Sequence, residues 1–592
     1  MKKLLALLLL VSTYTQAQPK GLGLPEHVKP EDRIAFTMYT VSENTVKMLA
    51  QFYPIQNYDP FETVLQIKEE GKWVTKDSVQ IVYPGYTAHF KIDHWDDTKP
   101  QEYRVAYNNV AFYEGTIQKN PRDKDDFVMG VFSCNSIFKE HGGDISRQDI
   151  VDNMLRIQPD LLFFAGDQTY NHSEHYWHWI LFGRQFGELF RNIPAIAIPD
   201  DHDIGQANLW GEAGKKGVHR NGWNGGYYMP VEYVKEVERA QTGHLPDPYD
   251  PTPVKQGIGT YYTSLNWGGI SFAILEDRKF KSGPGNVLAG KMNTSEPLTL
   301  DVPEAKLLGE RQLAFLEDWT DDWEDAEMKA VLSATIFASL NTESGVKSNK
   351  MDRDFDSNGW PQTGRNKALV IIRKSYSCMI AGDQHLGSVI KHGINEYGDA
   401  GYSFAGPAIA NLWMRYWEPE VTGPNAIEGL PYTGDYLDGF KNKISVKAVA
   451  NPKLRDNVPD PDLLKSRGAG IGVVRFNKKK RETTFECWPR NVDITKVDPL
   501  PGWPFTFNQL DNFTVNDGFE LPTIKTKQAN QVVTVKDGYT NEIVLSIRLN
   551  GKSFQPKVIQ EGDYDIYVGE GETTKIFYRV KAQKKNRQVL KN

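Results

Sequence analysis

Four hydrophobic segments of this chain each run directly into side chains that can bind metal ions or move protons. In chain order these residues are Cys134, Asp167, Tyr170, Asp201, His202, Asp383 and His385. Taken one at a time, a cysteine in a strand is usually a small core residue, and an aspartate after a strand often caps the next helix. Four segment ends that all carry such groups are harder to explain in that way. Carboxylate, thiolate, phenolate and imidazole groups together form a set that a pair of hard divalent or trivalent cations would recruit.

The pattern between residues 127 and 203 predicts how the first five of these residues meet. Strands are predicted at 127–134, 161–165 and 193–199, with a helix in each interval, the second over 175–192. Two consecutive strand–helix–strand units of this length imply parallel strands with right-handed crossovers. The carboxyl ends of parallel strands lie at one edge of the sheet. We therefore expect Cys134, Asp167 and the run 200–203 to share that edge.

The spacing of apolar residues and turn residues predicts further domains in the rest of the chain. Residues 25–120 alternate apolar and polar positions between turn residues, which predicts an N-terminal β-sandwich. Residues 127–500 form the predicted catalytic domain, with further strands at 270–277, 329–337 and 375–383 and a helix at 304–319. Residues 522–582 again alternate and are predicted to form a small C-terminal β-domain. The long segment 204–265 is interpreted as a functional loop.

The N-terminus is typical of a signal peptide. Lys2 and Lys3 precede an apolar run over 4–11 and a polar stretch, with cleavage predicted after Ala17. The run is far shorter than the ~20 residues that a membrane span needs, and no later segment is long and apolar enough to span. We therefore expect a secreted or periplasmic protein without a membrane span.

The cysteine count and the charge exclude some classes of protein. Three cysteines are too few for a disulfide scaffold, and Cys378 and Cys487 lie in strand-like runs where buried thiols are expected. The net charge is −7, and removal of residues 1–17 would take away two lysines. Nucleic acids and anionic membranes are poor partners for such a chain. An acidic chain that binds phosphate esters would need bound cations.

Five short motifs resemble those of the metallophosphoesterase superfamily, in particular its PhoD-like branch of secreted alkaline phosphatases and phosphodiesterases. The motifs are S-C-N at 133–135, G-D-x-x-Y at 166–170, D-D-H-D at 200–203, S-N-G-W-P at 357–361 and G-D-x-H at 382–385. The resemblance covers roughly residues 127–490, and the N-terminal β-domain also fits the branch. It implies an α/β/β/α sandwich core, flanked by the N-terminal β-sandwich and the small C-terminal β-domain.

The resemblance also implies a role for each candidate residue. Cys134 and Tyr170 would ligate ferric iron, Asp167 would bridge two metals, and His202 would be the catalytic histidine. Asp201 stands where relatives have an asparagine ligand, and Asp383 and His385 match the last ligand pair. The implied metals are Fe³⁺ and Ca²⁺. Anionic thiolate and phenolate stabilise the higher oxidation state of iron, and the additional carboxylate of Asp201 suits calcium.

The chain departs from the family pattern at some positions. Asn358 stands where the branch has an aspartate, and no separate histidine for the second metal is identified. Asn208 and His219, in the loop 204–265, are weak substitutes. Three histidines that follow Tyr170 are close to the site in sequence. They are His172, His175 and His178. Contact with the substrate is one interpretation of them, and a surface position is the favoured one. The aromatic residues at helical spacing in the following helix are expected in the core.

Three functions are compatible with these observations. The first is a secreted phosphoesterase that hydrolyses phosphate monoesters or diesters by metal-activated hydroxide attack. The second is a glycoside hydrolase with paired carboxylates, suggested by the aromatic-rich loops. The third is a non-catalytic extracellular binding protein that uses its β-domains. We favour the first, and the sequence does not indicate which phosphate ester is the substrate.

Overall fold

The computed structural model describes residues 22–592, apart from positions 26, 57, 345–349, 412, 454–463 and 465–467. The predicted signal peptide at 1–17 lies outside the described residues. Across the described part of the chain, no helix has the length and apolar character needed to cross a bilayer. The protein is of mixed α/β type, with many strands in several sheets and few helices.

The first large sheet carries the strands that were predicted to build the site. Its strands lie in the order β10 (Ala195–Ala197), β9 (Leu161–Phe164), β8 (Asp126–Asn135), β22 (Gly470–Asn477), β23 (Glu482–Pro489) and β24 (Phe505–Asn508). The strands β8, β9 and β10 are parallel and are linked by the helices α1 (Gln148–Ile157) and α2 (His175–Phe190). The predicted parallel arrangement is therefore confirmed, and the ends of these strands share one edge.

The second large sheet supplies the remaining predicted site residues. Its order is β11 (Thr263–Trp267), β12 (Ile270–Ile274), β13 (Met328–Thr335), β15 (Cys378–Gly382), β17 (Tyr402–Ala405), β16 (Ser388–His392), β21 (Lys443–Val449) and β20 (Gly434–Leu437). The strands β12, β13, β15 and β17 are parallel. The helices α5 (Gly309–Asp321) and α6 (Gln362–Lys374) pack on this sheet, where Phe315 and Leu369 share a buried cluster with Val331 and Met379.

The two sheets share a hydrophobic core and meet closely at the site edge. Buried side chains of β8 and β22 belong to the same cluster as those of β13 and β17. At the end of β15, a Cβ on Gly382 would lie 2.5 Å from the Cβ of Ser133 and 2.9 Å from that of Ala165. No other residue fits there without displacing its neighbours. This glycine therefore allows the end of β15 to reach the ends of β8 and β9, and so brings Asp383 beside Cys134.

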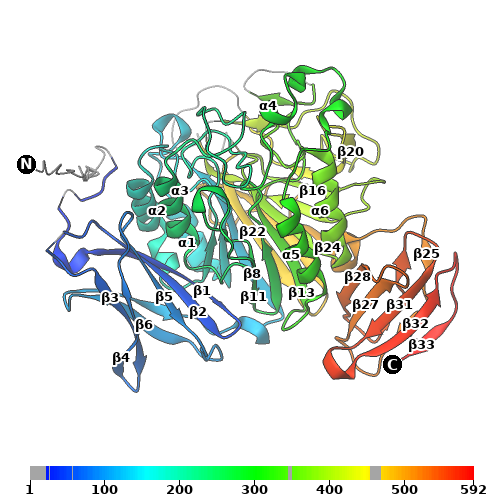
Figure 1. The fold of residues 1–592 in the computed structure, drawn as a ribbon, viewed down its shortest axis with the longest axis horizontal. Helices are drawn as coiled ribbons and strands as arrows, with labels where there is room; N and C mark the ends of the chain where they lie inside the picture. The colour runs from blue at the N-terminus through cyan, green and yellow to red at the C-terminus, as the bar shows by residue number, and fades with distance from the viewer. Residues whose placement is uncertain are drawn as a thin grey trace, which may run out of the picture.

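Two smaller β-units flank this central part on opposite sides (Figure 1). The N-terminal unit has two antiparallel sheets, formed by β1 (Ile34–Ser42), β2 (Thr45–Phe52) and β5 (Thr87–Ile92), and by β4 (Lys72–Gln80), β3 (Glu62–Glu69), β6 (Gln101–Tyr107) and β7 (Ala111–Ile117). It packs on α2, where a Cβ on Gly183 would lie 1.9 Å from the ring of Phe36. The absence of a side chain at Gly183 thus allows β1 to lie directly on the helix.

The buried core of the C-terminal unit also includes Trp323, Ala326 and Tyr376 of the central part. Its main sheet has the antiparallel order β28 (Ile543–Arg548), β27 (Val532–Asp537), β31 (Asp563–Val568) and β32 (Lys575–Lys581). The remaining elements are α3 (Val231–Thr242), α4 (Pro284–Val287), β14 (Glu343–Ser344), β18 (Ala408–Ala410), β19 (Arg415–Tyr416), β25 (Phe519–Glu520), β26 (Thr523–Lys525), β29 (Ser553–Phe554), β30 (Lys557–Val558) and β33 (Val589–Lys591).

Some predicted elements have different bounds in the structure. The helix expected at 304–319 begins only at Gly309, and the strand expected at 375–383 begins at Cys378. The segment 204–265, interpreted as one long loop, contains the helix α3. Val234 and Val237 of that helix are buried against Ile204 and Ile258, so a small local core stabilises the segment.

Candidate metal centre

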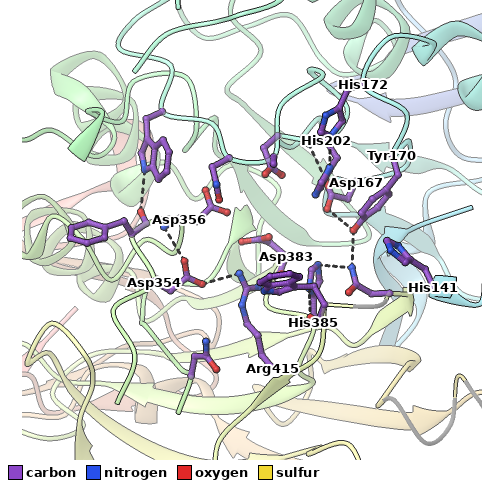
Figure 2. A pocket seen from close by; sticks show the side chains of 18 of the residues that line it. His141, Asp167, Tyr170, His172, His202, Asp354, Asp356, Asp383, His385 and Arg415 are labelled. Atoms are coloured by element: carbon purple, nitrogen blue, oxygen red, sulfur yellow. Dashed lines mark hydrogen bonds and ion pairs between the residues drawn. The ribbon is translucent and has the colours of Figure 1, made fainter. Parts of the chain in front are cut away.

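The carboxyl ends of β9, β10 and β15 surround a cavity of about 760 Å³ (Figure 2). Six of the seven predicted site residues line this cavity, namely Asp167, Tyr170, Asp201, His202, Asp383 and His385. The seventh, Cys134, is fully buried but lies beside two of them, as described below. The residues that the sequence placed at one edge are therefore brought together by the fold.

Four of these residues adopt a left-handed backbone conformation. The φ angles are 57° at Cys134, 60° at Asp167, 57° at Asp383 and 53° at His385. This region is uncommon for residues other than glycine, and such residues collect at functional sites where the surrounding structure compensates for the strain. Each strand therefore turns sharply where it reaches the site.

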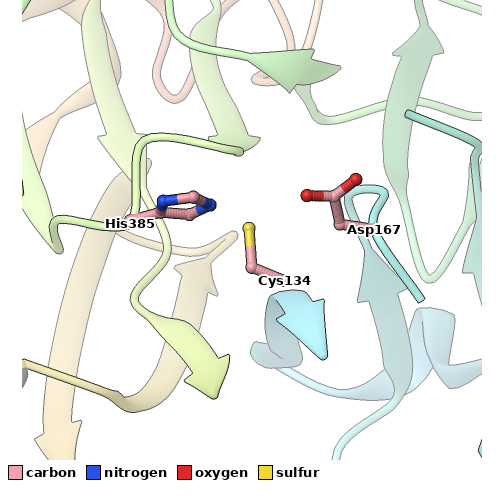
Figure 3. Close-up of side chains that lie close together, drawn as sticks. All are labelled: Cys134, Asp167 and His385. Atoms are coloured by element: carbon pink, nitrogen blue, oxygen red, sulfur yellow. The ribbon is translucent and has the colours of Figure 1, made fainter. Parts of the chain in front are cut away.

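The first group of ligand atoms comes from three strand ends. The Sγ of Cys134, a carboxylate oxygen of Asp167 and a ring nitrogen of His385 all lie within 4.8 Å of one another (Figure 3). The hydroxyl of Tyr170 donates to Asp167 Oδ2 at 2.8 Å. Burial raises the pKa of the Cys134 thiol well above its usual value, and the carboxylates of Asp167 and Asp383 raise it further. A positive charge in this position would reverse that effect.

The hydrogen bonds of His385 show which ring nitrogen carries the hydrogen and which carries the lone pair. Its Nδ1 lies 2.8 Å from the backbone carbonyl of Trp413, which can only accept, so Nδ1 carries the hydrogen. The lone pair is therefore on Nε2, which accepts from the side-chain amide of Asn411 at 2.9 Å. The same amide lies 3.1 Å from the hydroxyl of Tyr170. Asn411 thus joins the two side chains on the cavity side.

The second group of ligand atoms consists mainly of carboxylates. Oxygens of Asp167, Asp200, Asp201 and Asp383 lie within 4.8 Å of one another. Burial and repulsion between these carboxylates raise the pKa of Asp167 and of Asp201 well above the usual range. One oxygen of Asp201, Oδ1, is buried without a hydrogen-bond partner. A buried acceptor of this kind is unfavourable unless a cation or donor reaches it.

His202 is held from two sides. Its ring stacks on Tyr170 with centroids 4.3 Å apart, and its Nδ1 lies 2.7 Å from Nε2 of His172. Its backbone N–H donates to Asp167 Oδ1 at 3.3 Å. Burial lowers the pKa of His202 well below its usual value, and the neighbouring His172 lowers it further.

Arg278 is the main cation in the carboxylate group, and sequence reasoning did not identify it. Its guanidinium lies 2.6 Å from Asp356, 3.1 Å from Asp383 and within hydrogen-bond distance of Asp200. Although burial raises the pKa of Asp383, Arg278 and Arg415 hold that pKa below its usual range. The signal was available, because Arg278 follows the strand β12 as Asp167 follows β9.

Asp203 organises the loops rather than lining the cavity. Its carboxylate accepts from the backbone N–H groups of Asp167, Thr169 and Asp200 at 2.7, 2.8 and 3.0 Å. It therefore fixes the turn after β9 to the turn after β10. The last aspartate of the D-D-H-D run therefore has a structural role. Its position in the motif alone did not distinguish this role from metal binding.

Asn358, Asn208 and His219 were the weaker candidates for the site. Asn358 does not line the cavity. Its side-chain amide donates to Asp277 at 2.7 Å, and Asp354 and Asp356, shortly before it in the chain, reach the cavity instead. His219 is exposed and does not line the cavity, whereas Asn208 does.

The surface position predicted for His175 and His178 is wrong. His175 and His178 are buried, and burial lowers their pKa to about 3 and about 4. His172 is half-buried and lines the cavity. The reason is that both the N-terminal unit and α3 cover parts of α2, so the helix has little exposed surface. Tyr176 donates to the carbonyl of Phe52 in the N-terminal unit, and the ring of His175 contacts Tyr233 of α3. The aromatic residues of the helix are in the core as predicted. They are Trp179, Phe182, Phe186 and Phe190.

The three cysteines are free thiols, and all are buried. Cys378 and Cys487 share the main hydrophobic core, as predicted. Burial raises the pKa of Cys378 to about 12, which makes it inert at neutral pH. Cys134 differs from both because carboxylate and imidazole groups surround it.

Comparison with known proteins supports the fold. No family model matches the chain, and no curated protein matches its sequence. The solved structure described as "Structure of PhoD" aligns over 94% of both chains, with a TM-score of 0.52 and 12% identity. At this identity the likeness shows a PhoD-like fold and no more.

Two glycan-active enzymes also align, with TM-scores too low to support any inference. They are a cycloisomaltooligosaccharide glucanotransferase from Paenibacillus sp. (TM-score 0.18, 9% identity, 93% of this chain and 71% of that one) and a beta-glycosidase from Bacteroides vulgatus (TM-score 0.19, 10% identity, 92% and 79%).

Proposed function

We propose that this chain is an exported, metal-dependent phosphoesterase that hydrolyses phosphate monoesters, diesters or both. The observation that carries the proposal is the position of Asp167. Its carboxylate belongs both to the group with Cys134 and His385 and to the group with Asp201 and Asp383. One carboxylate between two sets of ligands is what a pair of bridged cations requires.

The donor atoms fit two different cations. Cys134, Tyr170 and His385 offer thiolate, phenolate and imidazole, which together with Asp167 suit ferric iron. On the other side, Asp201 and Asp383 offer carboxylate oxygens, which suit calcium. The unpartnered Oδ1 of Asp201 and the mutual repulsion of the buried carboxylates support a cation there. When bound, such a pair supplies Lewis acidity to a phosphoryl group and an acidified water.

The residues of the chain would bind and orient the ester. The cavity of about 760 Å³ is far larger than a phosphate group, so the organic part of the substrate also lies inside it. His202 lines the cavity beside Asp167 and would donate to a phosphoryl or leaving oxygen. The aromatic side chains of Trp223, Phe355 and Trp413 line the remaining wall and would contact the organic part.

The remaining parts of the proposal concern architecture and export. The two large sheets with α1 and α2 on one and α5 and α6 on the other would form the α/β/β/α sandwich of metallophosphoesterases. The three domains would be those expected at 25–120, 127–500 and 522–582, with the central one extended to β24 (Phe505–Asn508) and the C-terminal one reaching from β25 (Phe519–Glu520) to β33 (Val589–Lys591). The signal peptide at 1–17 would direct the protein to the periplasm or outside the cell. The partner is a phosphate ester, not nucleic acid.

Hydrolysis assays test the proposal against both alternatives. The purified protein should cleave p-nitrophenyl phosphate, its bis ester, or both, and chelation should abolish the activity. His202→Ala should lower kcat by about 10²–10⁴-fold. Activity on glycans that survives chelation would favour a glycoside hydrolase. No activity on either ester after metal addition would favour a binding protein.

A further inference from the structure

We propose that Arg220 and His172 are positioning residues for His202. Together they determine which of its two ring nitrogens carries the hydrogen. They would hold His202 with its hydrogen on Nε2, as a donor to the substrate. This inference rests on the proposed function, because it concerns the side chain placed beside the phosphoester. It goes further by stating how that side chain is prepared.

The three side chains form one hydrogen-bonded row at the cavity. Nη2 of Arg220 lies 3.0 Å from Nδ1 of His172, and Nε2 of His172 lies 2.7 Å from Nδ1 of His202. All three line the cavity, and Arg220 is the exposed member. Figure 2 shows His172 and His202 with their rings adjacent above Asp167.

The chemistry of arginine determines which atom donates and which accepts in each of these hydrogen bonds. A guanidinium has only N–H donors, so Nδ1 of His172 must accept. A neutral imidazole has one donor and one acceptor, and Nε2 of His172 therefore donates to His202. Nδ1 of His202 must then accept, which leaves its hydrogen on Nε2. The opposite direction would place two N–H groups against each other between Arg220 and His172.

The position of the His202 ring is fixed by further contacts. Its stacking on Tyr170 at 4.3 Å, and the ring of His172 at 4.9 Å, restrict rotation about the side-chain bonds. A flip of the ring would also break the 2.7 Å bond to His172. The Nε2–H group is therefore held in one place without the cost of ordering it when substrate binds.

His385 has the opposite tautomer, and the contrast assigns different roles to the two histidines. The carbonyl of Trp413 accepts a hydrogen bond from Nδ1–H of His385, so the lone pair that a metal ligand needs is on Nε2. The amide of Asn411 donates to this lone pair, and a bound cation would take the place of that donor. In His202 the lone pair on Nδ1 is used by His172, and Nε2 presents a hydrogen. The second-sphere partners thus make His385 a ligand and His202 a donor.

Two variants at position 172 test the positioning role, because only one of them keeps both hydrogen bonds. His172→Gln keeps a donor for His202 and an acceptor for Arg220, whereas His172→Leu has neither. At equal metal content, His172→Leu should lower kcat by about 10- to 100-fold with little change in KM, a part of the usual effect of such a group. His172→Gln should recover most of that loss. An equal loss in both variants, or no loss in either, would overturn the proposal.

Variants at position 220 separate positioning from direct substrate binding. Arg220→Met should lower kcat, and Arg220→Lys should recover it because lysine also only donates. If Arg220→Met instead raises KM and leaves kcat unchanged, Arg220 binds the substrate itself and the proposal is wrong. The matched control is His219→Leu, at an exposed position beside Arg220 that does not line the cavity.

A spectroscopic measurement tests the tautomer without any substrate. The full chain, labelled with nitrogen-isotope histidine and exchanged with zinc, should show His202 with a protonated Nε2 and a bare Nδ1. The His202 signals are assigned by their loss in His202→Gln. A protonated Nδ1 would contradict the proposal. Because this readout needs no turnover, it still decides the inference if the protein proves inactive on esters.

Discussion

Asp167 is the residue on which the account of the site depends. Its Oδ2 accepts from Tyr170 and its Oδ1 from the backbone of His202, and its carboxylate lies within reach of both ligand groups. Asp167 also belongs to a third group of potential ligands, with Asp201 and His202. Among the described residues, no other side chain belongs to all three groups. The consequences of replacing it should therefore differ from those of replacing any other ligand.

Asp167→Asn should release both cations, whereas Asp201→Asn should affect only one. The amide loses the charge that two cations share, so we expect both iron and calcium to fall in Asp167→Asn. The loss of activity should be at least the ~10- to 100-fold that outer-shell changes cost at metal sites. Asp201→Asn should retain iron, because Asp201 is not in the group with Cys134. Metal analysis of both purified variants checks this, and equal iron loss in the two would contradict a shared carboxylate.

A second prediction at this scale concerns the contribution of Arg278 to the stability of the fold. It is buried and compensates Asp200, Asp356 and Asp383. Arg278→Met leaves these carboxylates without their cation, which should lower the free energy of unfolding by about 3–5 kcal/mol. Denaturant unfolding of the two proteins at matched metal content measures this difference in the free energy of unfolding.

Arg311→Gln is the matched control for Arg278→Met. The Arg311–Asp250 pair is about 30% exposed on each side, so its loss should cost only about 0–1 kcal/mol. A similar small change in both variants would show that Arg278 is not needed to hold the carboxylates.

At the scale of elements, the turn at Gly166 allows the ends of β9 and β10 to approach each other closely. The φ angle there is 98°, and a Cβ would lie 2.4 Å from the Cβ of Asp200. Gly166→Ala should therefore combine backbone strain with a clash that moves Asp167.

A matched glycine separates these two costs. Gly71, in the turn between β3 and β4, has a φ of 78° and no atom within 4 Å of a new Cβ. Gly71→Ala should cost about 1–2 kcal/mol of unfolding free energy from strain alone. Gly166→Ala should exceed it by at least about 1 kcal/mol and should also lose bound metal. Equal destabilisation of the two variants, with metal retained, would show that the turn at Gly166 tolerates a side chain.

The comparison between sequence and structure is clearest for these elements. The strand–helix periodicity was enough to predict β8, β9 and β10 as parallel neighbours, because crossover handedness leaves few alternatives. It could not show that β15 lies in a different sheet whose end meets theirs, because that contact depends on the absence of a side chain at Gly382.

The residues that sequence reasoning missed act through contacts between distant segments. Arg278 pairs with aspartates from three other segments. Asp356 reaches the cavity while Asn358, two residues on, bonds to Asp277. His172 bonds to His202 and Arg220 from other loops at the cavity, and local periodicity does not show such contacts. These relations are set by packing rather than by spacing.

At the scale of the whole molecule, the half-buried His89 and the buried His244 lie where the N-terminal unit meets the segment around Gly243. His89 lies in β5, and His244 bonds through Nε2 to the carbonyl of Ala195 in β10 at 2.9 Å. Thr40 of β1 donates to the carbonyl of His244. Burial, with Arg239 and Lys47 nearby, lowers the pKa of His89 to about 4, and burial lowers that of His244 to about 3.

This interface should make the protein sensitive to acid. Both histidines bind fewer protons in the folded than in the unfolded state, so their stability contribution is complete above pH 6.5 and is lost as pH falls toward 4. For His89 alone the loss is about 2 kcal/mol by pH 5. His89→Gln should weaken this pH dependence, measured by denaturant unfolding between pH 7 and 5. The control is His94→Gln, at an exposed position, and the same slope in both variants would contradict the prediction.

The metal content of the purified protein decides whether Asp167 lies between two bound cations. We predict that iron and calcium co-purify with the chain, and that the protein absorbs visible light through charge transfer from Tyr170 or Cys134 to ferric iron. Both metals should be lost together in Asp167→Asn. A colourless protein that binds neither metal, even after both are supplied, would contradict a bridged pair of cations at Asp167.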